Sequence, residues 1–237
     1  MVVSHKIKES VTSVVIDYTK VLGVEWTLAL RKTLDSTYMD NLQCFIRETY
    51  RSSDQIYPRN PEDIFRALEL TPIKNLKAVI FADNPFPSTH ANGLAFGSFK
   101  TCRGMNKLPQ TLAIEQCLAP DSVTLTDNFD PTMRDWAEKG VLMLSTALIT
   151  NKEQDPKYNL VFRNFIREVI EVVNQKMVDC VFVFTSQKQA QTFAQYIDLA
   201  FNHMLVYPDG ITADCSIFTD INMVLEREAD FKATIEW

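Results

Sequence analysis

Short apolar runs separated by amphipathic segments are the main pattern of this chain. Four runs are almost entirely apolar and have the length of buried strands: Ala78–Phe81, Val141–Leu144, Val181–Phe184 and Met204–Val206. Strands that are apolar on both faces are typical of parallel sheets, which helices cover on both sides. The pattern therefore predicts an α/β fold.

Between these runs, apolar residues recur at helical spacing. The clearest helix is expected over Phe162–Val173, and others over 37–50, 190–201 and 220–228. A further helix is expected from the N-cap Asn60, followed by Pro61, to about Leu70. We expect one domain over 1–237, with a helical N-terminal part (1–55) and a three-layer α/β/α arrangement around a short parallel four-stranded sheet.

The carboxyl ends of the four strands indicate where a ligand would bind. In open α/β sheets, ligands bind beyond these ends because the crossover loops converge there. The four loops begin at Ala82, Ser145, Thr185 and Tyr207. Their Pro, Ser, Asp and Gly residues are also ordinary turn residues. The pattern alone therefore predicts a cleft but no particular chemistry.

Composition excludes several classes of protein. The net charge of −6 weighs against a protein that coats DNA, although one that grips only a few phosphates can be acidic elsewhere. No apolar run approaches the roughly 18 residues of a membrane span, and the N-terminus lacks the apolar segment of a signal peptide. We expect a soluble protein of the cytoplasm or nucleus, with a virus or phage as one origin.

Cysteine and histidine give no sign of a disulfide framework or a metal site. The five cysteines contain no close pair, and their odd number argues against disulfides, so we expect buried thiols. The three histidines are far apart in the sequence, and His90 is expected on the surface. No cofactor or metal is expected.

The loop after the first apolar run carries the most specific motif. Residues 82–87 read Ala-Asp-Asn-Pro-Phe-Pro, and residues 93–96 read Gly-Leu-Ala-Phe. This pair resembles the water-activating loop of uracil-DNA glycosylases, Gly-Gln-Asp-Pro-Tyr-His, and the Gly-Leu-Ala/Cys-Phe segment that follows it. The resemblance covers nearly the whole chain, with further matching segments at 56–58, 62–65, 70–72, 108–112, 136–150 and 235–237.

The resemblance implies a base pocket in which most reacting positions differ from the family. Asn84 stands where the family has its water-activating Asp, Phe86 where it has the Tyr that blocks thymine, and Ser145 where it has the Asn that pairs with uracil. Tyr207 stands in place of the His that stabilises the departing base. Phe96, the aromatic that stacks on the base, is unchanged.

Two carboxylates near these positions, Asp83 and Asp209, are candidates to replace the missing one, although Asp is also a common turn residue. Because the family hydrolyses an N-glycosidic bond with water, Asn84 can still orient a water through its carbonyl, as in the mismatch-specific branch of the superfamily. The resemblance also predicts residues that contact DNA: Ser98, Pro109, Gln110, Thr111, Ser186, Pro208 and Ile211, the last in place of the family's wedge Leu.

Two interpretations follow. In the first, the protein is a DNA glycosylase that flips a nucleotide and releases an altered or modified base, since Ser145 leaves a roomier pocket. In the second, it has lost catalysis and binds DNA or a protein partner, either as a replication component, like a poxvirus member of the family, or as a decoy for glycosylase inhibitors. The retained Phe96 and the loop at 108–112 favour the first interpretation.

Overall fold

The computed structural model describes residues 17–99, 114, 130–228 and 234–237. Its central element is a parallel sheet with the spatial order β3-β2-β5-β6. The strands are β2 (Ala78–Ala82), β3 (Val141–Ser145), β5 (Val181–Phe184) and β6 (His203–Val206). All four strands predicted from the apolar runs are confirmed, each within one residue of its expected bounds.

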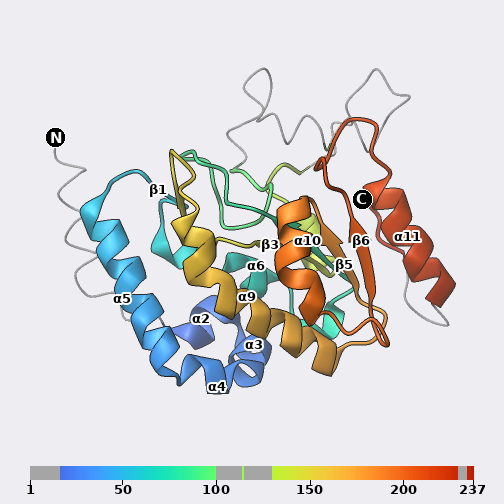
Figure 1. The fold of residues 1–237 in the computed structure, drawn as a ribbon, viewed down its shortest axis with the longest axis horizontal. Coiled ribbons are helices and arrows are strands. Elements are labelled where there is room, and N and C mark those ends of the chain that lie inside the picture. Colours follow the sequence, from blue (N-terminus) through green and yellow to red (C-terminus); the bar gives the residue numbers. More distant parts are fainter. Residues whose placement is uncertain (1–16, 100–113, 115–129, 229–233) are drawn as a thin grey trace.

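Helices surround this sheet (Figure 1). The α-helices are α2 (Tyr18–Leu22), α3 (Val24–Ala29), α4 (Arg31–Leu34), α5 (Thr37–Ser52), α6 (Arg66–Leu70), α8 (Arg134–Glu138), α9 (Lys157–Lys176), α10 (Gln187–Phe193) and α11 (Ile217–Glu228). Among the described residues, three 3₁₀ turns accompany them: η1 (Pro61–Asp63), η2 (Ile73–Asn75) and η5 (Ala194–Tyr196). No helix in the described part of the chain is long and apolar enough to cross a membrane.

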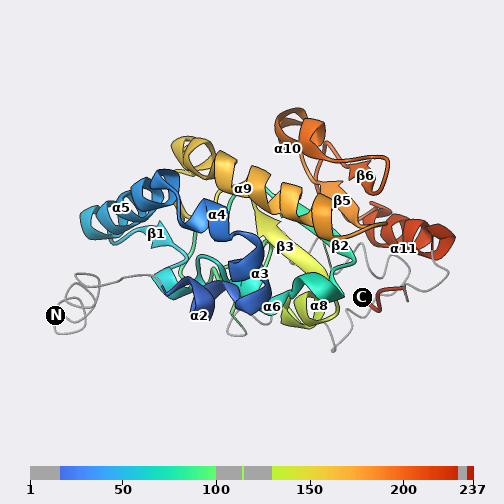
Figure 2. The same ribbon diagram turned by 90° about the horizontal axis from the view of Figure 1, so that it is seen from below.

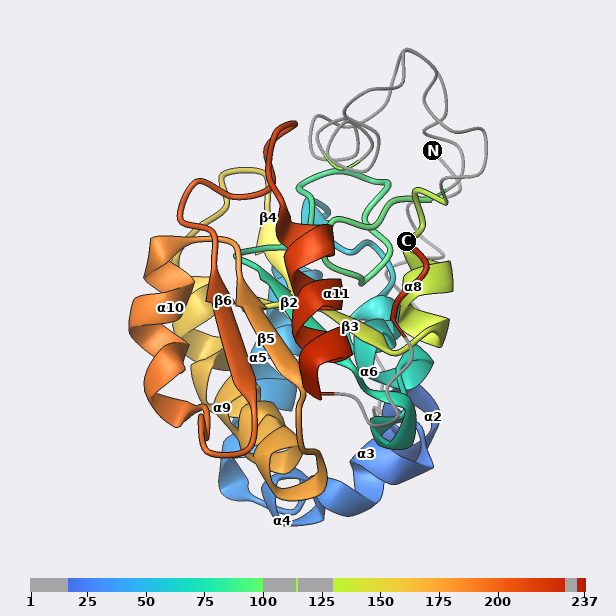
Figure 3. The same cartoon turned by 90° about the vertical axis from the view of Figure 1, so that its right-hand side faces the viewer.

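The sheet has a layer of helices on each face, as Figures 2 and 3 show. Successive side chains of a strand point to opposite faces. Val79 and Phe81 therefore join the larger core cluster together with Phe162 of α9, whereas Ile80 joins a second cluster with Trp136 of α8 and residues of α11. The expected three-layer α/β/α arrangement is confirmed.

The strand register brings the loops to one edge of the sheet. Ala78 pairs with Val141 and Ala82 with Ser145, so β2 and β3 end at the same level. Across the other side of β2, Phe81 pairs with Phe184, the last residue of β5. The loops after these strands therefore start side by side. A separate antiparallel pair, β1 (Ile56–Tyr57) with β4 (Thr150–Asn151), was not predicted, because two-residue strands show no periodicity.

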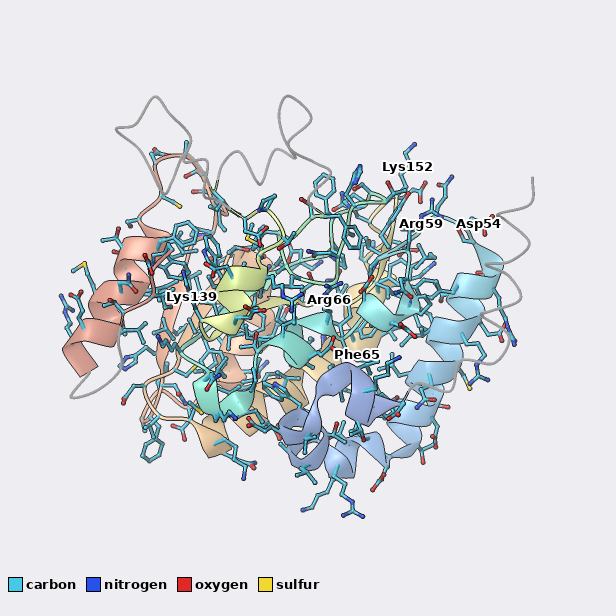
Figure 4. The ribbon with its side chains drawn as sticks, turned by 180° about the vertical axis from the view of Figure 1, so that it is seen from behind. Asp54, Arg59, Phe65, Arg66, Lys139 and Lys152 are labelled. Carbon is cyan, nitrogen blue, oxygen red and sulfur yellow. The ribbon has the colours of Figure 1, made fainter. Side chains whose placement is uncertain are left out.

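The helix expected between residues 60 and 70 is interrupted. Asn60 caps as expected, with Oδ1 accepting a hydrogen bond from the Glu62 N–H at 3.2 Å. The segment then forms only the turn η1, and Phe65 leaves helical geometry (φ −105°, ψ 12°) before α6 begins. Asp63 pairs with Arg66, labelled in Figure 4, at 2.9 Å across this break. The prediction of one continuous helix is wrong here.

The helix expected over residues 190–201 starts earlier and ends sooner. It begins after Ser186, whose hydroxyl accepts a hydrogen bond from the Gln189 N–H, and η5 closes at Tyr196. The side chain of Asn174, from α9, donates to the Tyr196 carbonyl at 2.7 Å and accepts from the Asp198 N–H at 3.2 Å. This contact from another helix ends the segment, which periodicity cannot reveal.

Burial confirms part of the expectations about single residues. Trp26 and Trp136 lie in the core. Among the described cysteines only Cys180 is buried, whereas Cys215 is half-buried and Cys44 is exposed, so the expectation of buried thiols is wrong for Cys44. Cys44 lies on the outer face of α5, where helical periodicity points it to solvent.

Candidate functional site

A cavity of about 420 Å³ lies beyond the carboxyl ends of the strands. Three of the four loops expected to converge contribute to it: those that follow β2, β5 and β6. In Figure 1 the green loop after β2 and the orange-red loop after β6 lie at the upper edge of the molecule. The described residues that line the cavity are Ala82, Asp83, Asn84, Pro85, Phe86, Pro87, Phe96, Gln154, Thr185, Asp209, Gly210 and Ile211.

The fourth loop, after β3, contributes no lining residue among those described, but it is hydrogen-bonded to the loop that does. The Thr146 N–H donates to the Ala82 carbonyl at 2.7 Å, and the Ala95 N–H donates to the Met143 carbonyl at 3.0 Å. These bonds hold both ends of the 82–96 segment against β3. The last residue of that strand, Ser145, is thereby placed beside the segment.

The carboxylate of Asp83 is held by hydrogen bonds from the N-cap and the first turn of α10. Its Oδ1 accepts from the Ser186 hydroxyl at 3.1 Å and from the Gln189 side-chain amide at 3.0 Å. Gln189 in turn accepts from the Thr185 N–H at 2.9 Å. The Asp83 side chain therefore joins the β2 loop to the N-terminal end of α10.

The backbone carbonyl of Asp83 is equally well satisfied. It accepts from the Thr146 hydroxyl at 3.0 Å, the Ala147 N–H at 3.1 Å and the Asn159 side-chain amide at 2.8 Å. Thr146 and Ala147 come from the β3 loop, and Asn159 from α9. Asp83 is thus fixed to three other elements, which determines where Asn84 is placed.

Asn84 and Ser145 differ from Asp83 in having buried oxygens without a partner. Asn84 Oδ1 and Ser145 Oγ are shielded from solvent, and neither has a hydrogen-bond partner among the described residues. Asn84 lines the cavity, whereas Ser145, 3% exposed, is not among the described lining residues but pairs in the sheet with Ala82, which is. Because buried polar atoms are nearly always paired in folded proteins, such atoms at a cavity indicate a place where a ligand or water is bound.

Two aromatic side chains, Phe86 and Phe96, form apolar walls of the cavity. Phe96 packs against the second core cluster and has a left-handed backbone, with φ of 60°. A positive φ is unusual for a large residue without a short polar side chain. The neighbouring bond from Gly97 N–H to the Leu94 carbonyl, 3.1 Å, closes the turn that imposes it.

Of the candidate residues in the loop after β6, some line the cavity and others do not. Asp209 and Ile211 line the cavity, and Pro208 is exposed at its edge. Tyr207 is not among the described lining residues: its hydroxyl donates to Asp220 Oδ2 at 2.5 Å. Burial, followed by this bond and the charge of Asp220, raises the pKa of the Tyr207 hydroxyl above its ordinary value, so the phenol stays neutral.

The residues expected to contact DNA are only partly available for it. Ser98 is fully buried, its N–H and hydroxyl directed at the Pro131 carbonyl at 2.8 and 3.5 Å, so in this conformation it offers nothing to a phosphate. Ser186 is half-buried and bonded to Asp83. Pro109, Gln110 and Thr111 lie outside the described residues.

The structure adds residues that the sequence reasoning missed. Gln154 lines the cavity from the loop after β4, while Gln189 and Asn159 hold Asp83. One signal was available for Gln189. A Ser followed three residues later by Gln is the pattern of a capping box, in which the Gln side chain turns back toward the helix start. Asn159 and Gln154 carry no such signal.

The described residues contain no group of three or more His, Cys, Asp and Glu side chains that could hold a metal ion. The groups at the cavity are amide, hydroxyl and carboxylate groups together with two aromatic rings. Such a set can stack on a heteroaromatic ring and hydrogen-bond its polar edge.

Comparison with known proteins relates the whole chain to one family. The chain is 31% identical over 230 residues to the uracil-DNA glycosylase of Pseudomonas fluorescens strain Pf0-1, covering 91% of this chain and 94% of that protein. It is 30% identical over 227 residues to the enzyme of Pseudomonas aeruginosa strain UCBPP-PA14, with the same coverage. No family model matches.

Solved structures share the fold. Mimivirus uracil-DNA glycosylase aligns with a TM-score of 0.75 and 17% identity, covering 92% of this chain and 88% of that one. Its Y322L variant, solved in complex with UGI, aligns with a TM-score of 0.77 and 18% identity, covering 94% and 91%. With a relative above 30% identity along nearly its full length, the chain belongs to the uracil-DNA glycosylase family.

Proposed function

We propose that this protein is a DNA glycosylase of altered specificity, which flips a nucleotide and hydrolyses the N-glycosidic bond of an altered or modified base. The observation that carries the proposal is a pair of buried oxygens with no hydrogen-bond partner among the described residues: Asn84 Oδ1, at a cavity lined by two aromatic side chains, and Ser145 Oγ, on the strand residue paired with Ala82 of that lining. A protein that had kept only the fold would gain stability by replacing such atoms with apolar ones.

Asn84 is proposed to orient the attacking water. In N-glycosidic cleavage the sugar becomes cationic as the base leaves, and a water attacks the sugar carbon. A side-chain amide cannot take up the proton of that water, but its carbonyl oxygen can accept a hydrogen bond and align it. The five hydrogen bonds that Asp83 accepts hold Asn84 in place for this role.

Phe96 and Ser145 are proposed to hold the base. The ring of Phe96 would stack on it, and Phe86 would close the opposite wall. Ser145 has a shorter side chain than the Asn that the family carries, and its hydroxyl can donate or accept. This supports a pocket that admits a larger base and discriminates its polar edge less strictly.

The carboxylates are proposed to act through charge. Asp209 is exposed at the rim of the cavity, where it can stabilise positive charge on the sugar. Asp83 contributes a negative charge behind Asn84 while its side chain remains bonded to Ser186 and Gln189. Tyr207 would donate to the departing base only after leaving Asp220.

The proposed partner is DNA with a flipped base, single- or double-stranded, and we expect the protein to act inside cells, in cytoplasm or nucleus or as a viral protein in its host. Pro208 and Ile211 at the rim would face the strand, with Ile211 in the role of a wedge. Backbone groups of the loops are expected to contact phosphates, because the chain is acidic overall.

A second candidate function is a catalytically inactive module that binds DNA or a protein. The observation that favours it is the hydrogen bond of Tyr207 to Asp220, which turns the residue at the family's leaving-group position away from the cavity. A replication component or a decoy for an inhibitor protein would need no donor there. The mimivirus relative bound to UGI shows that this fold can be recognised by an inhibitor. For such a module, Phe96→Ala should leave the partner complex nearly unchanged.

The test is base release from end-labelled oligonucleotides carrying uracil, mismatched thymine, or 5-hydroxymethylated or glucosylated pyrimidines, followed by alkaline cleavage of the abasic product. We expect release of a modified base at a rate above that for uracil. The matched control is Asn84→Ala, purified in parallel from a host without its own uracil glycosylase, which reports contaminating activity. Absence of release from every substrate by the folded protein would overturn the proposal and favour the binding module.

A further inference from the structure

One carboxylate outside the cavity receives two short hydrogen bonds from the loop after β6. Asp220 Oδ2 accepts from the Tyr207 hydroxyl at 2.5 Å and from the Ser216 hydroxyl at 2.6 Å. We propose that Asp220 is a positioning residue that fixes the segment from Tyr207 to Ile211 over the cavity. We call its two hydrogen bonds the Asp220 clamp.

The chemistry of the clamp requires a carboxylate. Short O–H···O⁻ bonds are characteristic of an ionised acceptor and are about twice as strong as neutral ones. Tyr207 is half-buried, and its neutral hydroxyl remains a donor at ordinary pH. Asp220 lies in the first turn of α11, where a negative charge is also favoured by the helix dipole, and its N–H donates to the Ser216 carbonyl at 2.8 Å.

Backbone hydrogen bonds connect the clamped Tyr207 to the residues that line the cavity. The Tyr207 N–H donates to the Phe184 carbonyl at 2.8 Å, and the Tyr207 carbonyl accepts from the Gly210 N–H at 3.0 Å. Gly210 has φ of 81°, which closes a tight turn. Tyr207 is therefore tied to β5 by its backbone and to α11 by its side chain, and the turn it anchors presents Asp209, Gly210 and Ile211 to the cavity.

The loop also has packing contacts that do not involve the clamp. Tyr207 and Ile211 also pack, partly buried, against the second core cluster, which contains Phe218 and Ile221 of α11. A variant without the clamp is thus expected to fold with this loop less restrained. Asp220 itself is not among the described residues that line the cavity.

The consequence for activity rests on the proposed function. Ile211 at the rim would fill the space that a flipped base leaves in a duplex, whereas single-stranded DNA needs no such filling. Loosening the clamp should therefore reduce base release from double-stranded substrate more than from single-stranded substrate. A general loss of folding would reduce both alike.

The first test does not require activity. Hydrogen exchange of peptides spanning residues 204–216 would be followed by mass spectrometry in the full-length protein and in the variants Tyr207→Phe and Asp220→Asn. We expect exchange in these peptides to be at least about tenfold faster in both variants, because a hydrogen bond to a charged group is lost in each. Exchange in peptides of α9 should not change. Matched controls are Tyr196→Phe and Glu226→Gln, which alter the same side-chain types elsewhere.

The second test is the double variant Tyr207→Phe/Asp220→Asn. Partners in one hydrogen bond give non-additive effects, so the double variant should exchange no faster than the more affected single variant. On whichever substrate the base-release assay identifies, the rate of release from double-stranded DNA relative to that from single-stranded DNA should fall severalfold in the two single variants and in the double variant. Unchanged exchange at 204–216 in both single variants would overturn the clamp whether or not the protein is a glycosylase. Faster exchange with an unchanged release ratio would overturn the positioning role.

Discussion

Asp83 and Asn84 are consecutive residues with opposite hydrogen-bonding. Asp83 accepts five hydrogen bonds from three other elements, while the side-chain oxygen of Asn84 has no partner among the described residues. A side chain that is fully bonded within the protein serves the framework, whereas a buried oxygen left unbonded is available to something else. The comparison therefore distinguishes residues that hold the loops of the site together, such as Asp83, from residues available to a ligand, such as Asn84. The following predictions test this distinction.

The largest effect is expected from Asn84→Ala. If Asn84 orients the water, the rate of base release should fall by about a hundredfold, the order expected when a reacting group is no longer held in place. Because its oxygen has no hydrogen-bond partner among the described residues, the free energy of unfolding should change by less than about 1 kcal/mol. Single-turnover release and urea denaturation measure the two quantities, and fluorescence anisotropy should show nearly unchanged DNA binding. An unchanged release rate would remove Asn84 from the mechanism.

Asp83→Ala should behave in the opposite way, with its main effect on stability. Losing the acceptor for Ser186 and Gln189 is expected to cost about 2–3 kcal/mol of unfolding free energy, since hydrogen bonds to charged groups are among the stronger ones. The measurement is the urea midpoint. Asp83→Asn, which keeps an acceptor oxygen, should recover part of the loss. An equal urea midpoint for the wild type and Asp83→Ala would show that Asp83 is not needed to hold the loops together.

Substitutions of Ser145 should change the free energy of unfolding little and should change which base is released. Removing its unpartnered hydroxyl in Ser145→Ala should leave the unfolding free energy within about 1 kcal/mol of wild type. Ser145→Asn restores the residue that the family resemblance places there and should raise release of uracil relative to a modified pyrimidine, by about tenfold for one regained hydrogen bond. Competition between two labelled substrates in one tube measures the ratio. A ratio that does not move would exclude Ser145 from base contact.

The smallest effect concerns pH. The pKa of Tyr207 is raised above its ordinary value, first by burial and then by Asp220. A raised pKa means that the stabilising contribution of the neutral phenol is complete below pH about 10 and is lost as the pH rises through the folded-state pKa. We expect the urea midpoint of the wild type to fall more steeply above pH 10 than that of Tyr207→Phe. Parallel curves would show that Tyr207 is not held as described.

The strands of the sheet could be predicted from the sequence, whereas most contacts between the site residues could not. The four apolar runs predicted the strands because burial on both faces leaves a local signature, and the carboxyl-end rule then located three of the lining loops. The hydrogen bonds of Asp83 with Ser186 and Gln189 join residues more than a hundred positions apart in the sequence, and no local periodicity predicts such a contact. The same is true of Tyr207 and Asp220, whose contact depends on how α11 packs.

Family resemblance located positions but not orientations. Asn84, Phe86 and Phe96, which the resemblance assigns to a base pocket, line one cavity, whereas Tyr207 is not among its described lining residues. The resemblance also suggested that Ser98 contacts DNA, whereas this side chain is buried against the Pro131 carbonyl. The direction of a side chain is determined by its partners, and a substituted residue such as Tyr207 acquires partners that the family motif does not describe.

The left-handed backbone of Phe96 has a consequence for attempts to improve this protein. A large residue held at φ of 60° carries a conformational cost of order 1–3 kcal/mol, which glycine would not incur. Phe96→Gly would relieve this strain, but it would also remove the ring that packs against the second core cluster and that is proposed to hold the base. The strain at position 96 is thus retained together with a side chain that serves both packing and the proposed activity, and variants at this position should be assayed for stability and function together.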